Sequence, residues 1–300
     1  MKGLRDDGDT LNKISPLRIA SHSRHALDAV PDVLWVTLIC PFVPLRDRVY
    51  SLANVSRRWQ RLAWLSIHDD QMLDLTWCAG EHELDVFVEA ISTRSQSRVF
   101  GNQSEEWEHI EPPSKIEAFR LYGPRVTASV LSNLVAGITA ARVRRIEIES
   151  KQVDDMSLRC LNACTQLQCI MLHCVKLTAQ GLTELSRACG QLQRIDLSGC
   201  SRLCDEGVIA VAANCPRLTD INLFMCLRIS DRSLVALALR KHKTIQRVVV
   251  DRCLKISGLA LRFLMKSQPS LCSCRLLTVR RSKIKISWHL RSNFLPSHHV

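Results

Sequence analysis

Apolar residues recur along the chain with one spacing, which the stretch LQRIDLSGC shows most clearly. Leu192, Ile195 and Leu197 take the first, fourth and sixth positions, and Cys200 follows three residues later. The spacing starts seven times, at Ile116, Val143, Leu167, Leu192, Leu218, Ile245 and Leu271. Successive starts are separated by 24 (Val143 to Leu167) to 27 residues (Ile116 to Val143). A period of this length is typical of a solenoid, in which each unit stacks on its neighbours.

The second half of each unit predicts a helix. Three copies are LTAQGLTELSRAC (177–189), LCDEGVIAVAANC (203–215) and ISDRSLVALALRK (229–241). Their apolar residues recur three and four positions apart, which is typical of one buried helix face. Thr178, Asp205 and Asp231 precede these faces and are expected to be the N-caps. Each unit is therefore predicted to form a short strand, a turn and a helix.

The period, the strand pattern and the recurring cysteines resemble leucine-rich repeats of the cysteine-containing subtype. That resemblance implies an α/β solenoid with parallel strands on the concave side and helices on the convex side. Leu73, Leu75 and Cys78 fit the strand pattern earlier in the chain and are expected to open the array. Residues 84–91 have helical spacing. We interpret 66–115 as a degenerate first repeat with an inserted loop, and 116–279 as the leucine-rich repeats.

A different pattern precedes the repeats, in residues 30–62. Its apolar spacing predicts three short helices, one over Leu34, Leu38 and Ile39, one capped by Asp47, and one over Leu52, Val55 and Trp59. Pro44 is expected to end the first helix. Pro41 falls inside that helix, where an interior proline costs about 3 kcal/mol. A segment this short cannot build a strong core alone.

This segment resembles an F-box, a short helical motif. The resemblance rests on VPDVL at 30–34, PLRD at 44–47 and VSRRW at 55–59, with Val30 in place of the usual leucine. An F-box followed by cysteine-containing leucine-rich repeats is a known family arrangement. It implies a non-catalytic substrate-recognition subunit of an SCF-type cullin–RING ubiquitin ligase. In such a ligase the F-box docks a Skp-type adaptor, which joins the cullin scaffold, and the repeats bind the target protein for ubiquitination.

The resemblance divides the chain and names candidate contacts. We assign 1–27 to a disordered N-terminal segment, 28–65 to the F-box and 280–300 to a basic tail or divergent cap. Adaptor docking is expected to use apolar side chains that the motif cannot bury itself. The candidates are Pro31, Leu34, Pro44, Leu45, Leu52, Val55 and Trp59, whereas Leu38 and Leu62 are expected to pack internally. The alternative is a repeat scaffold outside ubiquitin chemistry, with this segment as its N-terminal cap.

Residues between the apolar positions of each strand face the other side of the sheet. They are expected to line the concave surface, and most of them are charged or polar. The candidates for target binding are Arg194, Asp196, Asn222, Phe224, Arg247 and Asp251. Phe224, with Met171 and Val249 near it, would make an apolar anchor inside a charged rim. The alternative for each position is a solvated strand residue.

The placement of the 14 cysteines favours packing over metal binding. One set follows successive strands, at Cys200, Cys226 and Cys253, and another precedes strands at helix ends, at Cys164, Cys189 and Cys215. Equivalent positions stack in rows along a solenoid, whereas a structural zinc site needs four converging ligands. We therefore expect no metal and no cofactor. The chain contains no nucleotide-binding loop, HExxH or GxSxG motif, so an enzyme is the least expected class.

Charge and hydropathy complete these expectations. The net charge is +12, and residues 280–300 carry five Lys/Arg and no acid. A basic tail can bind nucleic acid, but a solvated end is the simpler interpretation, and nucleic acid is not an expected partner. The most apolar stretch, 33–43, has 11 residues including Thr37 and is shorter than the roughly 20 residues of a membrane span, and the N-terminus lacks a signal-peptide pattern. We expect a protein of the cytoplasm or nucleus.

Overall fold

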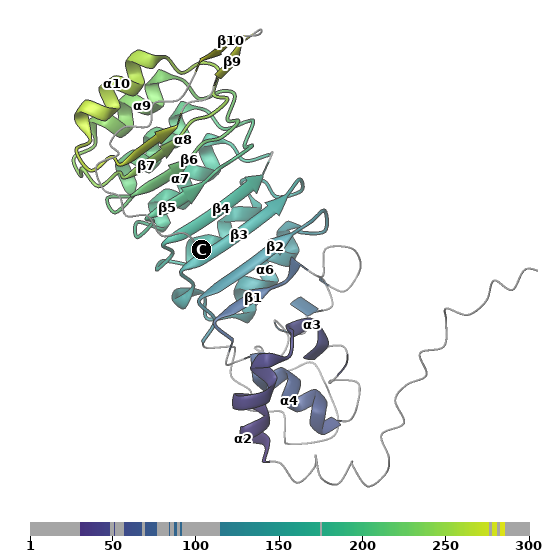
Figure 1. Cartoon of the computed structure of the whole chain (residues 1–300). Coiled ribbons are helices and arrows are strands. Elements are labelled where there is room, and N and C mark those ends of the chain that lie inside the picture. The colour runs from purple at the N-terminus through teal and green to yellow at the C-terminus, as the bar shows by residue number, and fades with distance from the viewer. Residues whose placement is uncertain are drawn as a thin grey trace, which may run out of the picture.

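The computed structural model describes residues 31–48, 51, 57–67, 70–76, 84, 87–88, 91, 115–174, 176–275, 278–280 and 283–285. Its centre is one eight-stranded sheet in which the strands follow one another in chain order. Helices cover one face of this sheet, and a group of short helices lies at the end near β1 (Figure 1). The predicted α/β architecture of parallel strands and helices is confirmed, and it is compatible with a leucine-rich-repeat-like solenoid.

Every neighbouring pair in the eight-stranded sheet is parallel. The strands are β1 (Met72–Asp74), β2 (Ala118–Tyr122), β3 (Arg145–Ser150), β4 (Cys169–Cys174), β5 (Arg194–Asp196), β6 (Asp220–Asn222), β7 (Arg247–Val249) and β8 (Ser273–Arg275). The register aligns the central apolar residue of each repeat, so Ile170 is paired with Ile195 and Ile195 with Ile221. β1 opens the sheet with Leu73 and Leu75 buried, as predicted. Cys78 lies outside the described residues.

A helix follows most strands and covers the sheet on its outer side. These helices are α6 (Ala128–Gly137), the 3-10 turn η6 (Ala140–Arg142), the 3-10 helix η7 (Ser157–Ala163), α7 (Ala179–Ala188), α8 (Asp205–Asn214), α9 (Asp231–Leu239) and α10 (Gly258–Ser267). The predicted helix in 84–91 is present at its described positions, where Leu84, Phe87, Val88 and Ile91 are helical and buried. Among the described residues, no helix is long and apolar enough to cross a membrane.

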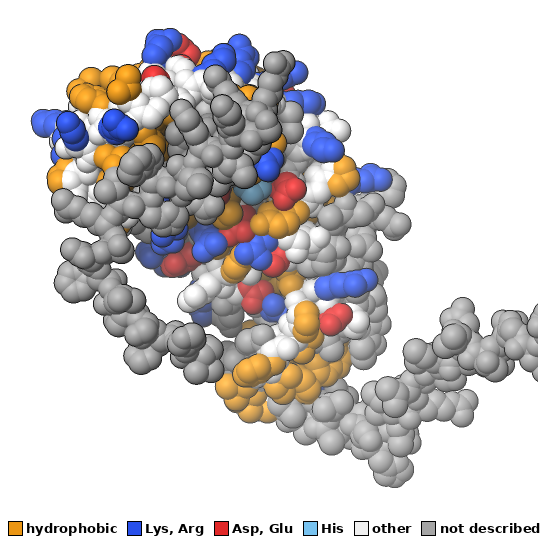
Figure 2. Space-filling model, turned by 45° about the horizontal axis from the view of Figure 1, so that its top comes forward, with side chains coloured by type: hydrophobic (Ala, Val, Ile, Leu, Met, Phe, Trp, Pro, Cys, Tyr) orange, Lys and Arg blue, Asp and Glu red, His pale blue; other side chains and the backbone are white. Residues whose placement is uncertain are grey.

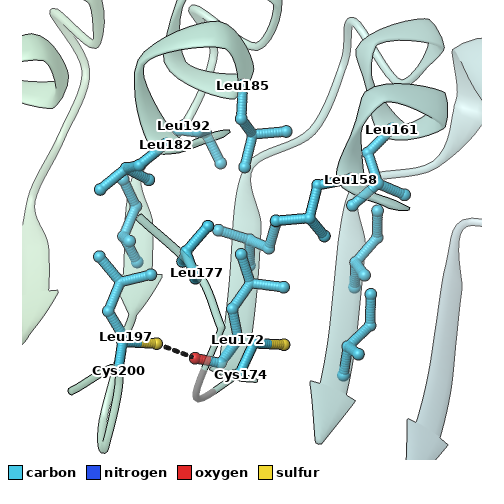
Figure 3. Close-up of a cluster of buried hydrophobic side chains, with 14 of the residues drawn as sticks. Leu158, Leu161, Leu172, Cys174, Leu177, Leu182, Leu185, Leu192, Leu197 and Cys200 are labelled. Carbon is cyan, nitrogen blue, oxygen red and sulfur yellow. Dashed lines mark hydrogen bonds between the residues drawn. The ribbon is translucent and has the colours of Figure 1, made fainter. Parts of the chain in front are cut away.

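The apolar core runs without interruption from β1 to β8 between the sheet and the helices. In each repeat, strand leucines such as Leu172 and Leu197 meet helix leucines such as Leu182 and Leu185, as Figure 3 shows. Full burial of a leucine contributes about 1.5–3 kcal/mol relative to exposure. Each unit alone would leave one side of this layer open, so stacking completes the core.

The cysteines after the strands pack against the preceding repeat. Cys200 Sγ donates to the carbonyl oxygen of Leu172 at 3.1 Å (Figure 3), and Cys226 Sγ donates to Leu197 O at 3.1 Å. Cys253 Sγ makes the same contact with Leu223 O, in the repeat before it, at 3.0 Å. Burial raises the pKa of the Cys200 thiol to about 11, so the thiol stays protonated at neutral pH. The prediction that this row serves packing is confirmed.

The helix N-termini correct one prediction. Thr178 is an N-cap, since its side chain accepts from Gln180 N, but Asp205 and Asp231 are the first residues inside α8 and α9. Their carboxylates reach the next repeat instead: Asp205 accepts from Ser230 N at 2.8 Å, and Asp231 from Ser257 N at 2.6 Å. Each carboxylate therefore links one repeat to the N-cap residue of the next.

The helical segment before the array is irregular around Pro41. After α2 (Asp32–Leu34) comes a π-helical turn, η1 (Trp35–Ile39), and then a 3-10 turn, η2 (Cys40–Phe42). Pro41 has no N–H to continue the α-helical ladder, and changes of helix type are a known answer to such a gap. Pro44 is the N-cap of α3 (Leu45–Asp47), so Asp47 lies inside that helix and does not cap it. Of the third predicted helix, Trp59 lies in α4 (Arg57–Ile67), whereas Leu52 and Val55 lie outside the described residues.

The C-terminal end of the described chain forms a separate two-stranded sheet. β9 (Thr278–Arg280) pairs antiparallel with β10 (Lys283–Lys285). The predicted basic tail thus begins with a short hairpin, and 286–300 lies outside the described residues, as does the predicted disordered segment 1–27.

Candidate functional site

The helical segment exposes five large apolar side chains among its described residues. Phe42 is 87% exposed and Val33 is 69% exposed, and they belong to an exposed set of Val33, Leu34, Leu38, Ile39 and Phe42. We call these five residues the apolar face. Figure 2 shows hydrophobic side chains gathered at the lower end of the molecule, beside this segment. An exposed group of large apolar side chains is typical of interaction surfaces.

Two tryptophans form the small internal core of the segment. The rings of Trp35 and Trp59 meet edge to face with centroids 4.4 Å apart, and Leu62 packs with them fully buried. Trp59 is only 8% exposed, so it is not a free docking side chain, contrary to prediction. Leu38, expected to pack internally, is exposed instead. Trp35 takes the inward position in η1, which is a π-helical turn and not an α-helical one, and Leu38 is left exposed.

Two ion pairs hold the segment together and against the array. Arg58 donates through Nε and Nη2 to Asp32 Oδ1, at 3.0 and 2.8 Å, and ties α4 to α2. Arg48 is buried and donates to Ser66 Oγ at 3.1 Å and to Asp70 Oδ2 at 2.8 Å. Asp70 lies just before β1, so Arg48 fixes α3 to the start of the sheet.

The remaining adaptor candidates divide into three groups. Pro31, Leu34 and Pro44 are exposed. Leu45 is half-buried and packs against the core of the array. Leu52 and Val55 lie outside the described residues. The sequence analysis did not select Val33, Ile39 or Phe42. The signal that could have found them is the apolar run 33–43, because a short helix that is apolar all round cannot bury every side chain.

The concave side of the sheet carries a second candidate site. A shallow hollow of about 230 Å³ lies over β3 to β7. Its charged and polar lining is Arg145, Arg194, Asp196, Asp220, Asn222 and Arg247, and Met171 and Val249 line it as well. Figure 2 shows basic and acidic side chains intermingled over the middle of the molecule. Four of the six predicted target-binding residues therefore line one hollow.

Glu147 is the centre of the charge network at the β2–β3 side. Its carboxylate is buried and accepts from Arg120 Nε at 2.7 Å, from Arg145 Nε at 2.7 Å and from Tyr122 Oη at 3.1 Å. Burial alone would raise the pKa of Glu147, but these three hydrogen bonds outweigh it and lower the pKa below its usual range. Arg120 also pairs with Asp74 at 2.9 Å, so the network spans three strands.

Asp196 is the centre of a second network. It accepts from the backbone N of Ser198 at 2.9 Å, from the Ser198 hydroxyl and from Asn222 Nδ2 at 2.8 Å. His173 Nε2 lies 3.5 Å from Asp196 Oδ1, and His173 Nδ1 lies 3.9 Å from Glu149. Burial tends to raise the pKa of Asp196, yet His173 and the hydrogen bonds lower it to about 2. The carboxylate of Asp196 in turn raises the pKa of His173.

Phe224 and Asp251 lie beyond the hollow, in the turns after β6 and β7. Phe224 is half-buried, with the guanidinium of Arg252 5.6 Å from its ring centroid. Asp251 is buried, so it does not present its side chain on the concave face as predicted. The two-residue alternation ends with β7 at Val249 and does not extend to Asp251. Met225 and Arg252 take left-handed φ angles of 58° and 62°, in the turn position that Gly199 occupies one repeat earlier.

Among the residues that the structure describes, no group of three or more His, Cys, Asp or Glu side chains is placed to hold a metal ion. The paired charges of the concave face satisfy one another and present guanidinium groups to solvent. What this arrangement can do chemically is to bind a partner through charge and hydrogen bonds.

Comparison with known proteins adds little. No family model matches the chain, and no curated protein matches it. Among solved structures, one match is a chain of the crystal structure of the Rad7 and Elc1 complex in yeast, with a TM-score of 0.32 and 13% sequence identity. The match covers 54% of this chain and 56% of that chain, so this chain spans about half the length of the matched one. At this similarity the match carries no argument about function.

Proposed function

We propose that this protein is a non-catalytic substrate receptor of an SCF-type cullin–RING ubiquitin ligase, working in the cytoplasm or nucleus. The helical segment would dock a Skp-type adaptor, and the concave face of the repeats would bind the target. The observation that carries this proposal is the apolar face, which stands beside a repeat array that needs none of these side chains for its core. The F-box-like motifs of the sequence assign the partner's class.

The apolar face has the properties of a docking surface. Its five side chains come from one run of ten residues, 33–42, and all are more than a third exposed. Each would contribute about 1.5–3 kcal/mol if a partner buried it fully. The Trp35–Trp59 contact and the Arg58–Asp32 pair hold the backbone beneath it, so less ordering is needed when a partner binds.

A repeat scaffold outside ubiquitin chemistry is the second candidate. The observation that favours it is the contact between the helical segment and the array: Ile67 belongs to the array's core, and Leu45 packs against that core. A segment that only sealed the end of the solenoid would need these contacts and no partner. It would not need Phe42 and Leu38 to face solvent.

Capture of a purified Skp-type adaptor tests the proposal. The full-length protein is immobilised, and bound adaptor is measured for wild type and for the double variant Leu38→Ser with Phe42→Ser. The matched control is Leu259→Ser with Phe263→Ser, another exposed Leu/Phe pair four residues apart, on α10. We expect wild type and control to capture the adaptor and the Leu38/Phe42 variant to lose it.

Two results would contradict the proposal. One is a wild-type protein that does not capture the adaptor. The other is equal capture by the Leu38/Phe42 variant and the control. In either case, unfolding of the array on deletion of 28–65 would favour the capping role.

A further inference from the structure

Three arginines lie in one row across the concave face, on alternate strands. Arg145 on β3, Arg194 on β5 and Arg247 on β7 hold equivalent positions, because the register connects them through Cys169 and Asp220. Neighbouring strands are about 4.8 Å apart, so successive arginines in the row are roughly 10 Å apart. All three line the same hollow.

Arg194 differs from the other two because no described residue neutralises it. Arg145 pairs with Glu147, and Arg247 pairs with Asp220 at 3.3 Å. Arg194 is exposed and has no hydrogen-bond or ion-pair partner among the described residues.

The two acids of the hollow are already engaged. Asp196 accepts from Ser198 and Asn222, and Asp220 accepts from Thr219 Oγ1 at 2.7 Å in addition to pairing with Arg247. The side chains of Arg145 and Arg247 remain 51% and 66% exposed. The row therefore presents guanidinium groups to solvent, with one of them unpaired at its centre.

We propose that this hollow binds an acidic segment of a partner protein, with one carboxylate on Arg194 and others toward Arg145 and Arg247. The inference deepens the proposed function and rests on it, because the array is the part that would hold the ubiquitination target. A chain in the polyproline-II conformation has three residues per turn and rises about 3.1 Å per residue, so acidic residues three apart lie on the same side and roughly 9 Å apart, close to the spacing of the row. A guanidinium suits this ligand because it binds a carboxylate through two parallel hydrogen bonds.

The spacing also argues against other anionic ligands. A single phosphoryl group is held best by arginines that converge on it, whereas these arginines are spread over five strands. A continuous polyanion such as nucleic acid would lie against Asp196, Asp220 and Glu149 as well as the arginines. A segment whose carboxylates are spaced like the arginines would place uncharged residues, and not further negative charge, beside these acids.

Fluorescence anisotropy of labelled peptides on the full-length protein tests the inference. The probe is a twelve-residue Gly/Ser peptide with glutamate at every third position. Its controls carry glutamine at the same positions, the same glutamates placed side by side, or a single phosphoserine. We expect the spaced-glutamate peptide to bind at least about tenfold more tightly than each control, with an affinity that falls as salt is added.

Variants at Arg194 test whether the peptide binds in the hollow. Arg194→Glu should weaken binding of the spaced-glutamate peptide at least about tenfold, and Arg194→Lys should weaken it less, because an ammonium keeps the charge and loses the paired geometry. Arg262→Glu, at an exposed position of α10 on the outer face, should leave binding unchanged. Circular dichroism of each variant should match wild type.

The outcomes that overturn the inference are specific. Equal binding of the glutamine peptide, tighter binding of the phosphoserine or adjacent-glutamate peptide, or equal effects of Arg194→Glu and Arg262→Glu would each do so. Adaptor capture is measured on the same preparations. Intact capture with no peptide binding overturns this inference alone, and peptide binding without capture overturns the proposed function alone.

Discussion

The repeat array and the helical segment before it differ in how far they bury their apolar side chains. In the array, each strand and helix covers the apolar side of the previous unit, and strand residues such as Leu172 and Leu197 have no exposed surface. Among the described residues of the segment, Trp35, Trp59 and Leu62 form a small internal cluster. The apolar face stays exposed.

Because of this difference, we expect stability to depend mainly on the array and partner recognition mainly on the segment. The array gains its free energy of unfolding from a continuous core and from contacts that repeat between units, such as the Cys200 thiol on Leu172 O. The segment gains little from its own small core, and under the proposed function a partner would cover its exposed side chains. Substitutions in the two regions should therefore change different measurements.

The largest expected effect on stability is in the array. Leu197→Ala should lower the free energy of unfolding by about 2–5 kcal/mol, because it removes buried methyl groups and leaves a cavity. Phe42→Ala on the apolar face should change it by less than about 0.5 kcal/mol. Urea unfolding followed by circular dichroism measures both. A Phe42→Ala variant as unstable as Leu197→Ala would mean that the face belongs to a core.

The next effect tests how the two regions are joined. Arg48→Ala should destabilise the junction by about 1–3 kcal/mol, since it removes the buried donor to Ser66 and Asp70. The control Arg58→Ala should cost at most about 1 kcal/mol, because the Arg58–Asp32 pair is partly exposed. Limited proteolysis between α4 and β1 should be faster in Arg48→Ala only. Equal cleavage of the two variants would argue that Arg48 does not join the regions.

An effect of similar size is expected for the cysteine row. Cys200→Ser should cost about 1–3 kcal/mol, because a more polar hydroxyl replaces a buried thiol. The control Cys272→Ser, at an exposed position, should change stability by less than about 0.5 kcal/mol. Thermal unfolding measures both, and addition of a chelator should leave the wild-type midpoint unchanged. A chelator that lowers the midpoint would contradict the packing role.

The smallest effect concerns His173. The carboxylate of Asp196 raises the pKa of His173, so the protonated imidazole stabilises the folded chain. This stabilisation is complete below the ordinary histidine pKa of about 6.5 and is lost as the pH rises through the folded-state value. NMR titration should show a His173 pKa above about 6.5 that falls in Asp196→Asn. A His173 pKa that is unchanged in Asp196→Asn would show that the Asp196 carboxylate does not raise it.

Much of the array could be predicted because the same apolar spacing occurs seven times. Each copy must bury its strand and helix residues against the neighbouring units. The strands at Leu192 and Leu218, the helices after them and the role of Cys200 all follow from one spacing. The N-cap prediction at Asp205 was wrong because a carboxylate at the first helical position can serve the next repeat, and that contact depends on stacking. Asp251 was misplaced because the alternation ends with its strand.

The helical segment was harder to predict for a physical reason. When nearly every residue in 33–43 is apolar, spacing does not tell which side chains turn inward. The contact between Trp35 and Trp59 decides the orientation, and it joins residues far apart in the chain. The pairing of Glu147 with Arg120 likewise needs the register of β2 against β3.

The most direct test of the account is calorimetric titration of a purified Skp-type adaptor into the full-length protein. We predict saturable binding of one adaptor per chain with a negative heat-capacity change, because the apolar face is buried on binding. We predict loss of this binding in Leu38→Ser with Phe42→Ser and its retention in Leu259→Ser with Phe263→Ser. Binding that is absent in wild type, or unaffected by the Leu38/Phe42 substitutions, would contradict the account.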